Sequence, residues 1–285
     1  MNYTIPKIKD ILSDKDEKYI LKILNKKPPV CYAKLSSNEI KNLENKIINN
    51  QEFKEYNNIL EQIKSIRSSY IKNKMIFNHQ SLLKNTNKII KDYNNKVNIL
   101  EISKNYDGSP LNIMRVILLK TNSKERIKKF FNNPSLLNDY DYEQFNLAKE
   151  NDDFALINQD EILKKATEFE KQIEEIIIKN NILYKTQEDL TQEQIKTHGK
   201  AFSTPDFLIE SELKINNRNI KWIDAKNFYG SNIKFVKSKI EEQTKKYLNN
   251  YGDGCIIFKL GFNEIYSENK NILFLSWNSF KELHQ

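Results

Sequence analysis

The stretch from Lys221 to Gly230 (KWIDAKNFYG) decides how the C-terminal half of this chain is interpreted. Its apolar and β-branched residues predict a strand that runs from Ile220 to Lys226. Asp224 and Lys226 are two positions apart, so both side chains point to the same face of such a strand. The stretch therefore predicts a carboxylate and an ammonium side by side at the end of a sheet.

A second carboxylate, Asp206, lies 18 residues earlier in the stretch Ser203 to Phe207 (STPDF). We expect the run 206–215 to form a strand that pairs with the strand of Asp224 through a hairpin turn at residues 216–219 (NNRN). Paired strands would bring the two carboxylates together. An aspartate after proline is also a common turn residue, but a turn role for Asp206 leaves Asp224 and Lys226 unexplained.

Two carboxylates that meet at the end of a sheet repel each other, and a divalent cation between them relieves the repulsion. The sequence therefore predicts a metal site at Asp206 and Asp224, with the backbone carbonyl of Ala225 as a further oxygen ligand. The ammonium of Lys226 on the same face could orient a water molecule and stabilise charge that builds on a phosphate.

The helix expected from Asp160 to Asn180 supplies a third carboxylate. Its apolar residues recur at helical spacing, and Glu170 lies inside that apolar stripe. A carboxylate among apolar side chains must find a cation or change its pKa. Glu170 is therefore the preferred third ligand, and Glu174, nearer the edge of the stripe, is the alternative.

The residues that follow this helix predict an α/β domain with a mixed sheet, placed at residues 151–285. The expected strands are 182–184, 206–215, 220–226, 255–260 and 272–275, with a helix at 236–250 after the third strand. Gln243 and Tyr247 lie four residues apart and therefore share one face of that helix.

The N-terminal region, residues 1–150, is expected to be helical from residue 6 onward. Apolar spacing indicates a helix after Ser36-Ser37 and a long amphipathic helix from Phe53 to Ile71. The segment 98–120 predicts two helices joined by a turn at Asp107-Gly108, with Ser109 as the N-cap of the second helix and Pro110 at its first position.

A helix, a short turn and a helix form the layout of the helix-turn-helix motif, whose second helix can enter a major groove. In this interpretation Asn112 and Arg115 face outward toward DNA, and Lys124 and Lys128 contact phosphates. An ordinary corner of a helical bundle explains the same pattern, and a run of charges is usually a solvated face.

The composition favours a polyanionic partner, because the formal charge is +8 and the pI is near 9.1. Lysine is also the default surface residue of a chain this rich in Lys, Asn and Ile, which explains the charge equally well. The two cysteines, Cys31 and Cys255, exclude a disulfide framework and make a cysteine-rich zinc site a poor expectation. With charges throughout the N-terminal segment and no run near the ~18 apolar residues of a membrane span, we expect an intracellular protein, nuclear or cytoplasmic, with no membrane partner.

Three segments resemble the TPD-motif family, which includes the codanin-interacting nuclease and archaeal relatives and belongs to the PD-(D/E)XK nuclease superfamily. They are STPDF at 203–207, KWIDAKNFYG at 221–230, and Gln243 with Tyr247 followed by Gly261-Phe262. The resemblance covers about residues 160–265, and the helical first half resembles the family only in general layout. It implies a restriction-endonuclease-like fold for the C-terminal domain.

The resemblance also implies roles for individual residues. Glu170, Asp206 and Asp224 would hold Mg²⁺ or Mn²⁺. Lys226 would activate water, Gln243 would lie near the metal, and Tyr247 would support the site or contact nucleic acid. The implied activity is that of a metal-dependent deoxyribonuclease acting on DNA, branched or flapped by analogy.

Several alternatives stay open at the level of sequence. RNA is an alternative substrate, and neither a homodimer nor a protein partner is decided by the sequence. A catalytically silent nuclease-like module that binds nucleic acid or a protein is the rival function.

Overall fold

The computed structural model describes residues 2–4, 10–48, 58–155 and 159–284. The chain forms two compact units, and each unit combines segments that are distant in sequence. The first comprises Met1–Ile20, Ile47–Ile66 and Asn158–Gln285, and the second comprises Leu21–Lys46 and Arg67–Ile157. This division differs from a single boundary at residue 150, because N-terminal segments belong to the first unit.

The first unit is a mixed α/β structure built on a five-stranded sheet with the strand order β10-β8-β7-β4-β3. The strands β7, β8 and β10 are parallel to one another, whereas β4 is antiparallel to both β7 and β3. The expected mixed sheet is therefore confirmed. The bounds are β3 (Tyr184–Thr186), β4 (Phe207–Ile209), β7 (Trp222–Lys226), β8 (Gly254–Phe258) and β10 (Ile272–Ser276).

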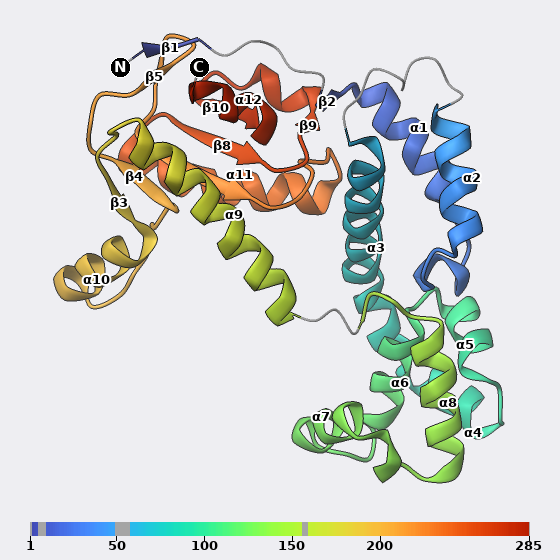
Figure 1. Ribbon diagram of the computed structural model, residues 1–285. Helices are drawn as coiled ribbons and strands as arrows, with labels where there is room; N and C mark the ends of the chain where they lie inside the picture. The colour runs from blue at the N-terminus through green and yellow to red at the C-terminus, as the bar shows by residue number, and fades with distance from the viewer. Residues whose placement is uncertain (1, 5–9, 49–57, 156–158, 285) are drawn as a thin grey trace. The chain divides into compact units, whose positions relative to one another are not determined.

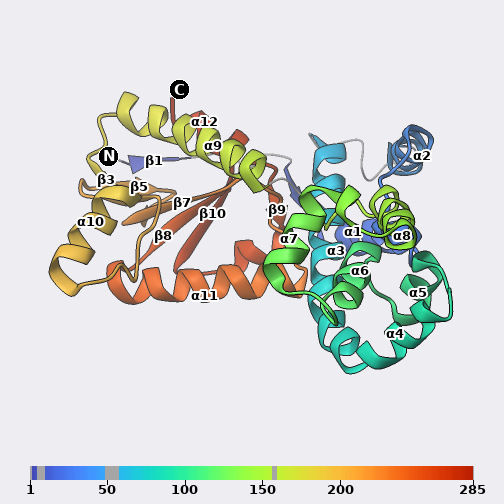
Figure 2. The same cartoon turned by 90° about the horizontal axis from the view of Figure 1, so that it is seen from below.

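Helices cover both faces of this sheet (Figure 2), with α9 (Gln159–Lys179) along one face and α11 (Lys234–Tyr251) along the other. Ile223 of β7 and Ile257 of β8 pack in one core with the apolar residues of α9 and α12 (Trp277–Lys281). Trp222 and Ile256, which point the opposite way, pack in a second core with α11. The continuous apolar runs of β7 and β8 thus reflect strands buried on both faces.

Two small sheets join N-terminal segments to the first unit. β1 (Asn2–Tyr3) pairs in parallel with β5 (Lys214–Ile215), and β2 (Ile11–Leu12) pairs in parallel with β9 (Phe262–Asn263). The expectation of helices alone before residue 150 is therefore wrong. Two-residue strands show no periodicity of their own, and their partners lie more than 200 residues away in sequence.

The run 206–215 does not form one strand, because β4 ends at Ile209 and β5 belongs to another sheet. A hairpin turn does form, but at Asn216 and Asn217 alone, with φ angles of 51° and 61°. It joins β5 to β6 (Arg218–Asn219), and not the strand of Asp206 to the strand of Asp224 as predicted. Positive φ at both central positions is typical of tight hairpins.

A helix that the sequence analysis missed, α10 (Gln187–His198), stands between β3 and β4 and extends from the end of the sheet (Figure 1). Of its side chains only Leu190 and Gln194 are buried, so it shows almost no apolar stripe. Its ends carry the local signals instead. Thr186 and Asp189 form a capping box, and Gly199 ends the helix in the left-handed conformation.

The second unit is helical. Its core gathers Leu82 with apolar residues of α4 to α8, of which Leu111, Ile113 and Met114 are fully buried. The helices are α2 (Ser37–Ile48), α4 (Thr86–Asn94), α5 (Ile99–Tyr106), α6 (Pro110–Leu118), α7 (Lys124–Asn132) and α8 (Asp139–Glu150), with 3₁₀ turns at Val30–Tyr32 and Pro134–Leu136. Segments of α1 (Asp14–Leu24) and α3 (Ile59–Lys84) belong to each unit.

The predicted helix pair of the second unit is confirmed in its local geometry. Ser109 accepts a hydrogen bond from the Asn112 backbone, Pro110 occupies the first turn of α6, and Asp107 adopts the left-handed conformation after α5. Contact with DNA through α6 stays a prediction. Of the predicted long helix, Phe53 and Tyr56 lie outside the described residues.

Among the residues that the structure describes, no helix is long and apolar enough to cross a membrane. Both cysteines, Cys31 and Cys255, are buried and free.

Candidate active site

The pairing of β4 with β7 places Asp206 beside Asp224. The register aligns Phe207 with Ile223, so the next residues outward are Asp206 and Asp224. Asp206 Oδ2 accepts a hydrogen bond of 2.7 Å from the backbone N–H of Ala225. The structure thus brings together the two carboxylates that the sequence singled out.

Lys226 lies on the same face of β7 as Asp224, and its Nζ forms an ion pair with Asp224 Oδ2. The Asp224 side chain is only 1% exposed, and that of Lys226 is 15% exposed. In this structure the Lys226 ammonium is the cation that faces the buried Asp224 Oδ2. A buried carboxylate oxygen that already faces a cation is a suitable ligand for a metal ion.

Helix α11 holds the other oxygen of Asp224. Gln243 Nε2 donates to Asp224 Oδ1 at 3.2 Å and to the Tyr247 hydroxyl at 2.8 Å. The Tyr247 hydroxyl lies 3.2 Å from the same Asp224 oxygen and 3.3 Å from the Thr204 carbonyl oxygen. Gln243 and Tyr247 therefore act together to orient Asp224.

The Tyr247 side chain is not available to a nucleic acid in this structure. Tyr247 is 5% exposed, and its ring packs against Trp222 with the centroids 5.1 Å apart. Of the two roles expected from the sequence, the structure gives it the supporting one. Burial and the nearby charge of Asp224 raise the pKa of the Tyr247 hydroxyl, which keeps it protonated.

The carboxylates perturb one another. Burial, followed by the charge of Asp224, raises the pKa of Asp206 to about 8. Burial and then Asp224 also raise the pKa of Glu170 on α9, while Lys226 opposes that shift. The charge of Asp224 therefore disfavours the charged forms of both Asp206 and Glu170, which is the electrostatic condition that a divalent cation relieves.

Glu170, rather than Glu174, lies near the two aspartates, and its role as a metal ligand stays a prediction. Glu170 lies within electrostatic range of Asp206, Asp224 and Lys226, whereas Glu174 accepts a 2.7 Å hydrogen bond from the Tyr184 hydroxyl. In the described part of the chain, no three Asp, Glu, His or Cys side chains are already close enough to hold a metal ion. Glu170 therefore stands near the Asp206–Asp224 pair without completing a cluster.

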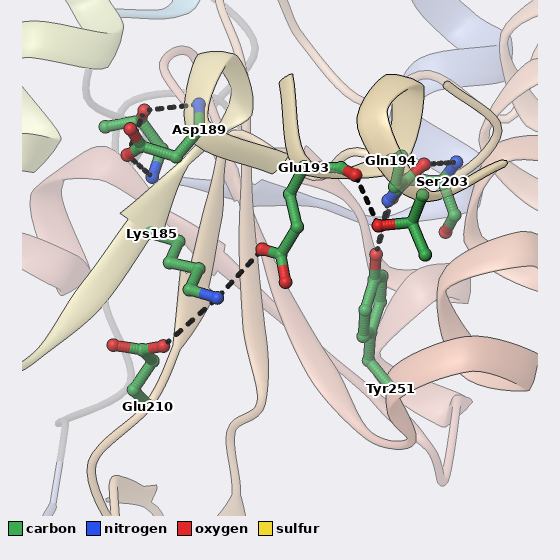
Figure 3. A network of polar contacts seen from close by, with 9 residues as sticks. Lys185, Asp189, Glu193, Gln194, Ser203, Glu210 and Tyr251 are labelled. Atoms are coloured by element: carbon green, nitrogen blue, oxygen red, sulfur yellow. Dashed lines mark hydrogen bonds and ion pairs between the residues drawn. The ribbon is translucent and has the colours of Figure 1, made fainter. Parts of the chain in front are cut away.

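A polar network outside this cluster fixes the loop that leads to Asp206, and the sequence analysis did not identify it (Figure 3). Gln194 of α10 accepts hydrogen bonds from the backbones of Phe202 and Ser203 and donates to the Ser203 carbonyl at 2.6 Å. Tyr251 of α11 donates to the same carbonyl at 2.5 Å. The sequence offers no signal for this role, because the burial of Gln194 is visible only in the structure.

The N-terminal segment fixes the loop after Lys226. Glu17 of α1 is 1% exposed and accepts hydrogen bonds from the Ser231 hydroxyl, from the Asn232 backbone at 3.0 Å and from Asn263 Nδ2 at 2.7 Å. The sequence offers one signal for it, because buried Ile20 lies three residues further along α1.

Three of the four residues that the sequence predicted as nucleic-acid contacts in the second unit lie together on its surface. Arg115, Lys124 and Lys128 line one surface hollow together with Phe131, and the Arg115 guanidinium lies 4.7 Å above the Phe131 ring. Asn112 does not line this hollow.

Part of the chain matches the model of a known protein family. Residues 139–278 match the model of a family described as "Protein of unknown function TPD sequence-motif". No solved structure matches the chain significantly.

Two kinds of curated relative match parts of the chain. The uncharacterized protein L539 of Acanthamoeba polyphaga mimivirus is 25% identical over 164 residues, which are 56% of this chain and 57% of the viral protein. CDAN1-interacting nuclease 1 from Bos taurus and from Homo sapiens is 26% identical over 88 residues, or 31% of this chain and 31% of the nuclease. The chain thus spans little more than half of the viral relative and about a third of the nucleases.

Proposed function

The chain belongs to the TPD sequence-motif family, and from this membership and the geometry above we propose that it is a metal-dependent nuclease. The proposed reaction is the hydrolysis of phosphodiester bonds in DNA. The observation that carries the proposal is the cluster at the end of β7, where Asp206, Asp224 and Lys226 meet. The match to a protein named as a nuclease supports the same reaction class.

The residues at this site fit a hard divalent cation. Asp224 Oδ2 is buried and already faces a cation, the Lys226 ammonium. The Lys221 carbonyl accepts a 2.8 Å hydrogen bond from the Ile209 backbone N–H of β4. By the alternation of the ladder the carbonyl of Ala225 faces the same side, beyond the end of β4. Carboxylate and carbonyl oxygens are the ligands that Mg²⁺ and Mn²⁺ prefer.

In the proposed mechanism Asp206, Asp224 and the Ala225 carbonyl would hold Mg²⁺ or Mn²⁺, with Glu170 as the third carboxylate near that pair. The bound cation would supply Lewis-acid stabilisation of the phosphate under attack. The Lys226 ammonium, on the same face of β7 as Asp224, would orient the attacking water and stabilise negative charge on the phosphate. Gln243 and Tyr247 keep Asp224 in place throughout.

The architecture supports a PD-(D/E)XK-like assignment of the first unit. Helix α9, the antiparallel pair β4–β7, helix α11 and the parallel strand β8 follow one another in the order expected for that superfamily. DNA is the proposed substrate because the chain is basic and the cluster suits phosphodiester chemistry.

The test is cleavage of end-labelled single-stranded, duplex, flap and four-way-junction DNA, with an RNA control, in Mg²⁺ or Mn²⁺. We expect cutting by the wild type and none by Asp224→Asn or Lys226→Ala. Asp224→Asn keeps the shape of the side chain, so a loss of cutting would not reflect a cavity. Asp253→Ala, which removes an exposed aspartate before β8, is the matched control and should cut like the wild type.

A second measurement separates the enzyme from a silent binding module. Mn²⁺ should raise the melting temperature of the wild type and leave that of Asp206→Ala unchanged, because binding to the folded state stabilises it. Binding of DNA without cutting on every substrate, and without stabilisation by Mn²⁺, would reject the nuclease and favour the module.

A further inference from the structure

We propose that the tip of α10, residues 195–202 (IKTHGKAF), binds an unpaired base of a DNA strand beside the candidate active site, with Phe202 as the stacking platform. This inference rests on the proposed nuclease function and deepens it, since it names DNA with unpaired bases as the substrate class.

The tip gathers exposed apolar and aromatic side chains at the end of one helix. Phe202 is 47% exposed and Ile195 is 51% exposed. The ring of His198 packs edge-on against Phe202, with centroids 5.4 Å apart and planes at 68°. Single exposed apolar residues are ordinary on protein surfaces, but an aromatic ring in a basic setting is the arrangement on which unpaired bases stack.

The charge of the tip complements a phosphate backbone. The segment 194–205 (QIKTHGKAFSTP) contains no aspartate or glutamate, while Lys196 and Lys200 are exposed beside His198. The acid that precedes this segment, Glu193, is paired with Lys185 at 2.8 Å (Figure 3). The tip therefore presents positive charge to the solvent, as counterion release by nucleic acids requires.

The platform is held in place before any ligand binds. The Phe202 backbone donates to Gln194 Oε1 at 2.9 Å, and the next residue, Ser203, is held by both Gln194 and Tyr251. The backbone under the ring is thus fixed while the ring itself stays exposed. A preordered aromatic loses little conformational entropy on binding, which favours affinity.

The platform also lies close to the proposed chemistry. Phe202 and Asp206 are four residues apart, so their Cα atoms are separated by at most about 14 Å. That distance corresponds to about four stacked steps of a DNA strand. A base on Phe202 would therefore belong to the strand that carries the scissile phosphate.

Only a base with an open face can stack on a side chain, which separates single strands, flaps and frayed ends from intact duplex. The platform would select substrates in which such a base lies within about four nucleotides of the cut.

The test measures binding of the full chain in EDTA, so that it does not depend on cleavage. The probes are a fluorescein-labelled 20-nucleotide single strand of DNA, the same sequence as a blunt duplex, and the same sequence as RNA. We expect Phe202→Ala and Phe202→Leu to weaken single-strand binding about 5- to 150-fold, the range of one stacked base, with less than a twofold change on the duplex. Phe202→Leu keeps an apolar side chain and removes only the ring.

Two further variants complete the design. Phe202→Trp should bind single strands at least as well as the wild type, and Phe77→Ala, which removes another exposed phenylalanine (54%), should change nothing. A strand with 2-aminopurine should lose fluorescence on the wild type and not on Phe202→Leu, because stacking quenches this base.

Equal losses on single strand and duplex, or unchanged binding by Phe202→Leu, would overturn the inference. Tighter binding of the RNA strand would overturn its assignment to DNA. Stacking without cleavage by the wild type would reject the proposed nuclease and leave the base-binding tip intact, so the two failures are distinguishable.

Discussion

Replacing Glu17 by alanine tests whether the N-terminal segment is a structural part of the candidate nuclease unit. Glu17 is 1% exposed, and its carboxylate accepts hydrogen bonds from Ser231, Asn232 and Asn263. Alanine would leave these three donors without that acceptor, and the two that are fully buried, Ser231 and Asn263, would cost about 1–3 kcal/mol each. Burial raises the pKa of Glu17, so the relief of its desolvation offsets part of that loss.

The net loss of unfolding free energy should therefore be about 3 kcal/mol. For a unit of this size, that loss lowers the melting temperature by roughly 6–12 °C. The assay is thermal unfolding followed by circular dichroism, with cleavage measured in parallel, because the anchored loop follows Lys226 directly. We expect cleavage to fall even at temperatures where the variant is folded.

The matched control is Glu161→Ala, which removes an exposed glutamate of α9 that is paired with Lys165 at 2.6 Å. Exposed pairs of this kind contribute about 0–1 kcal/mol, so its melting temperature should stay close to that of the wild type. A Glu17→Ala variant that melts within 2 °C of Glu161→Ala would refute the reasoning, since donors left without an acceptor should lower the unfolding free energy by more than that.

Three further predictions concern the sheet and the site. The raised pKa of Asp206 means that the folded state keeps a proton that the unfolded state releases, so without metal the unfolding free energy should fall between pH 4 and about pH 8, by at most ~1.4 kcal/mol per pH unit. Asp206→Asn should flatten this pH dependence in thermal melts. An unchanged slope in this variant would contradict the raised pKa of Asp206. Gly254→Ala should destabilise the protein by about 1–3 kcal/mol in denaturant titrations, because its Cβ would lie 2.1 Å from the ring of Trp222; a neutral effect would show that the ring can move aside. Gln243→Ala should raise the Mn²⁺ concentration for half-maximal cleavage about 10- to 100-fold, because it removes a group that orients a metal ligand. If the wild type and Gln243→Ala showed the same metal dependence, the hydrogen bond from Gln243 to Asp224 would not have this role.

Local signals predicted the features that depend on a few neighbouring residues. Ser109 and Pro110 set the start of α6 because a hydroxyl can cap backbone N–H groups and proline already has a helical φ. Asn216 and Asn217 form the hairpin turn because asparagine tolerates positive φ.

Local signals did not predict every helix. Helix α10 has the capping signal of Thr186 with Asp189 but almost no apolar periodicity, since most of its surface is exposed. A search for apolar stripes alone could not find it. The segment at its C-terminal end is exposed for the same reason, because Ile195 and Phe202 do not pack into a core.

Some residues of the candidate site could be placed from local geometry, and others only from the packing of helices on the sheet. Strand alternation was sufficient to place Asp224 and Lys226 on one face, and the pairing of neighbouring strands was sufficient to bring Asp206 to them. Helical periodicity already preferred Glu170 over Glu174, but only the packing of α9 on the sheet showed that Glu170 interacts electrostatically with Asp206 and Asp224 while Glu174 binds Tyr184.

The sequence by itself therefore determined the α/β character of the C-terminal half, the acid pair with its lysine, and the Gln243–Tyr247 face of α11. Only the tertiary structure showed that Glu17 anchors the loop after Lys226 and that Gln194 fixes the loop before Asp206. The physical reason is that caps, turns and alternation act over a few residues, where stereochemistry links sequence to geometry. A buried hydrogen bond between residues 17 and 263 depends instead on how the whole chain packs.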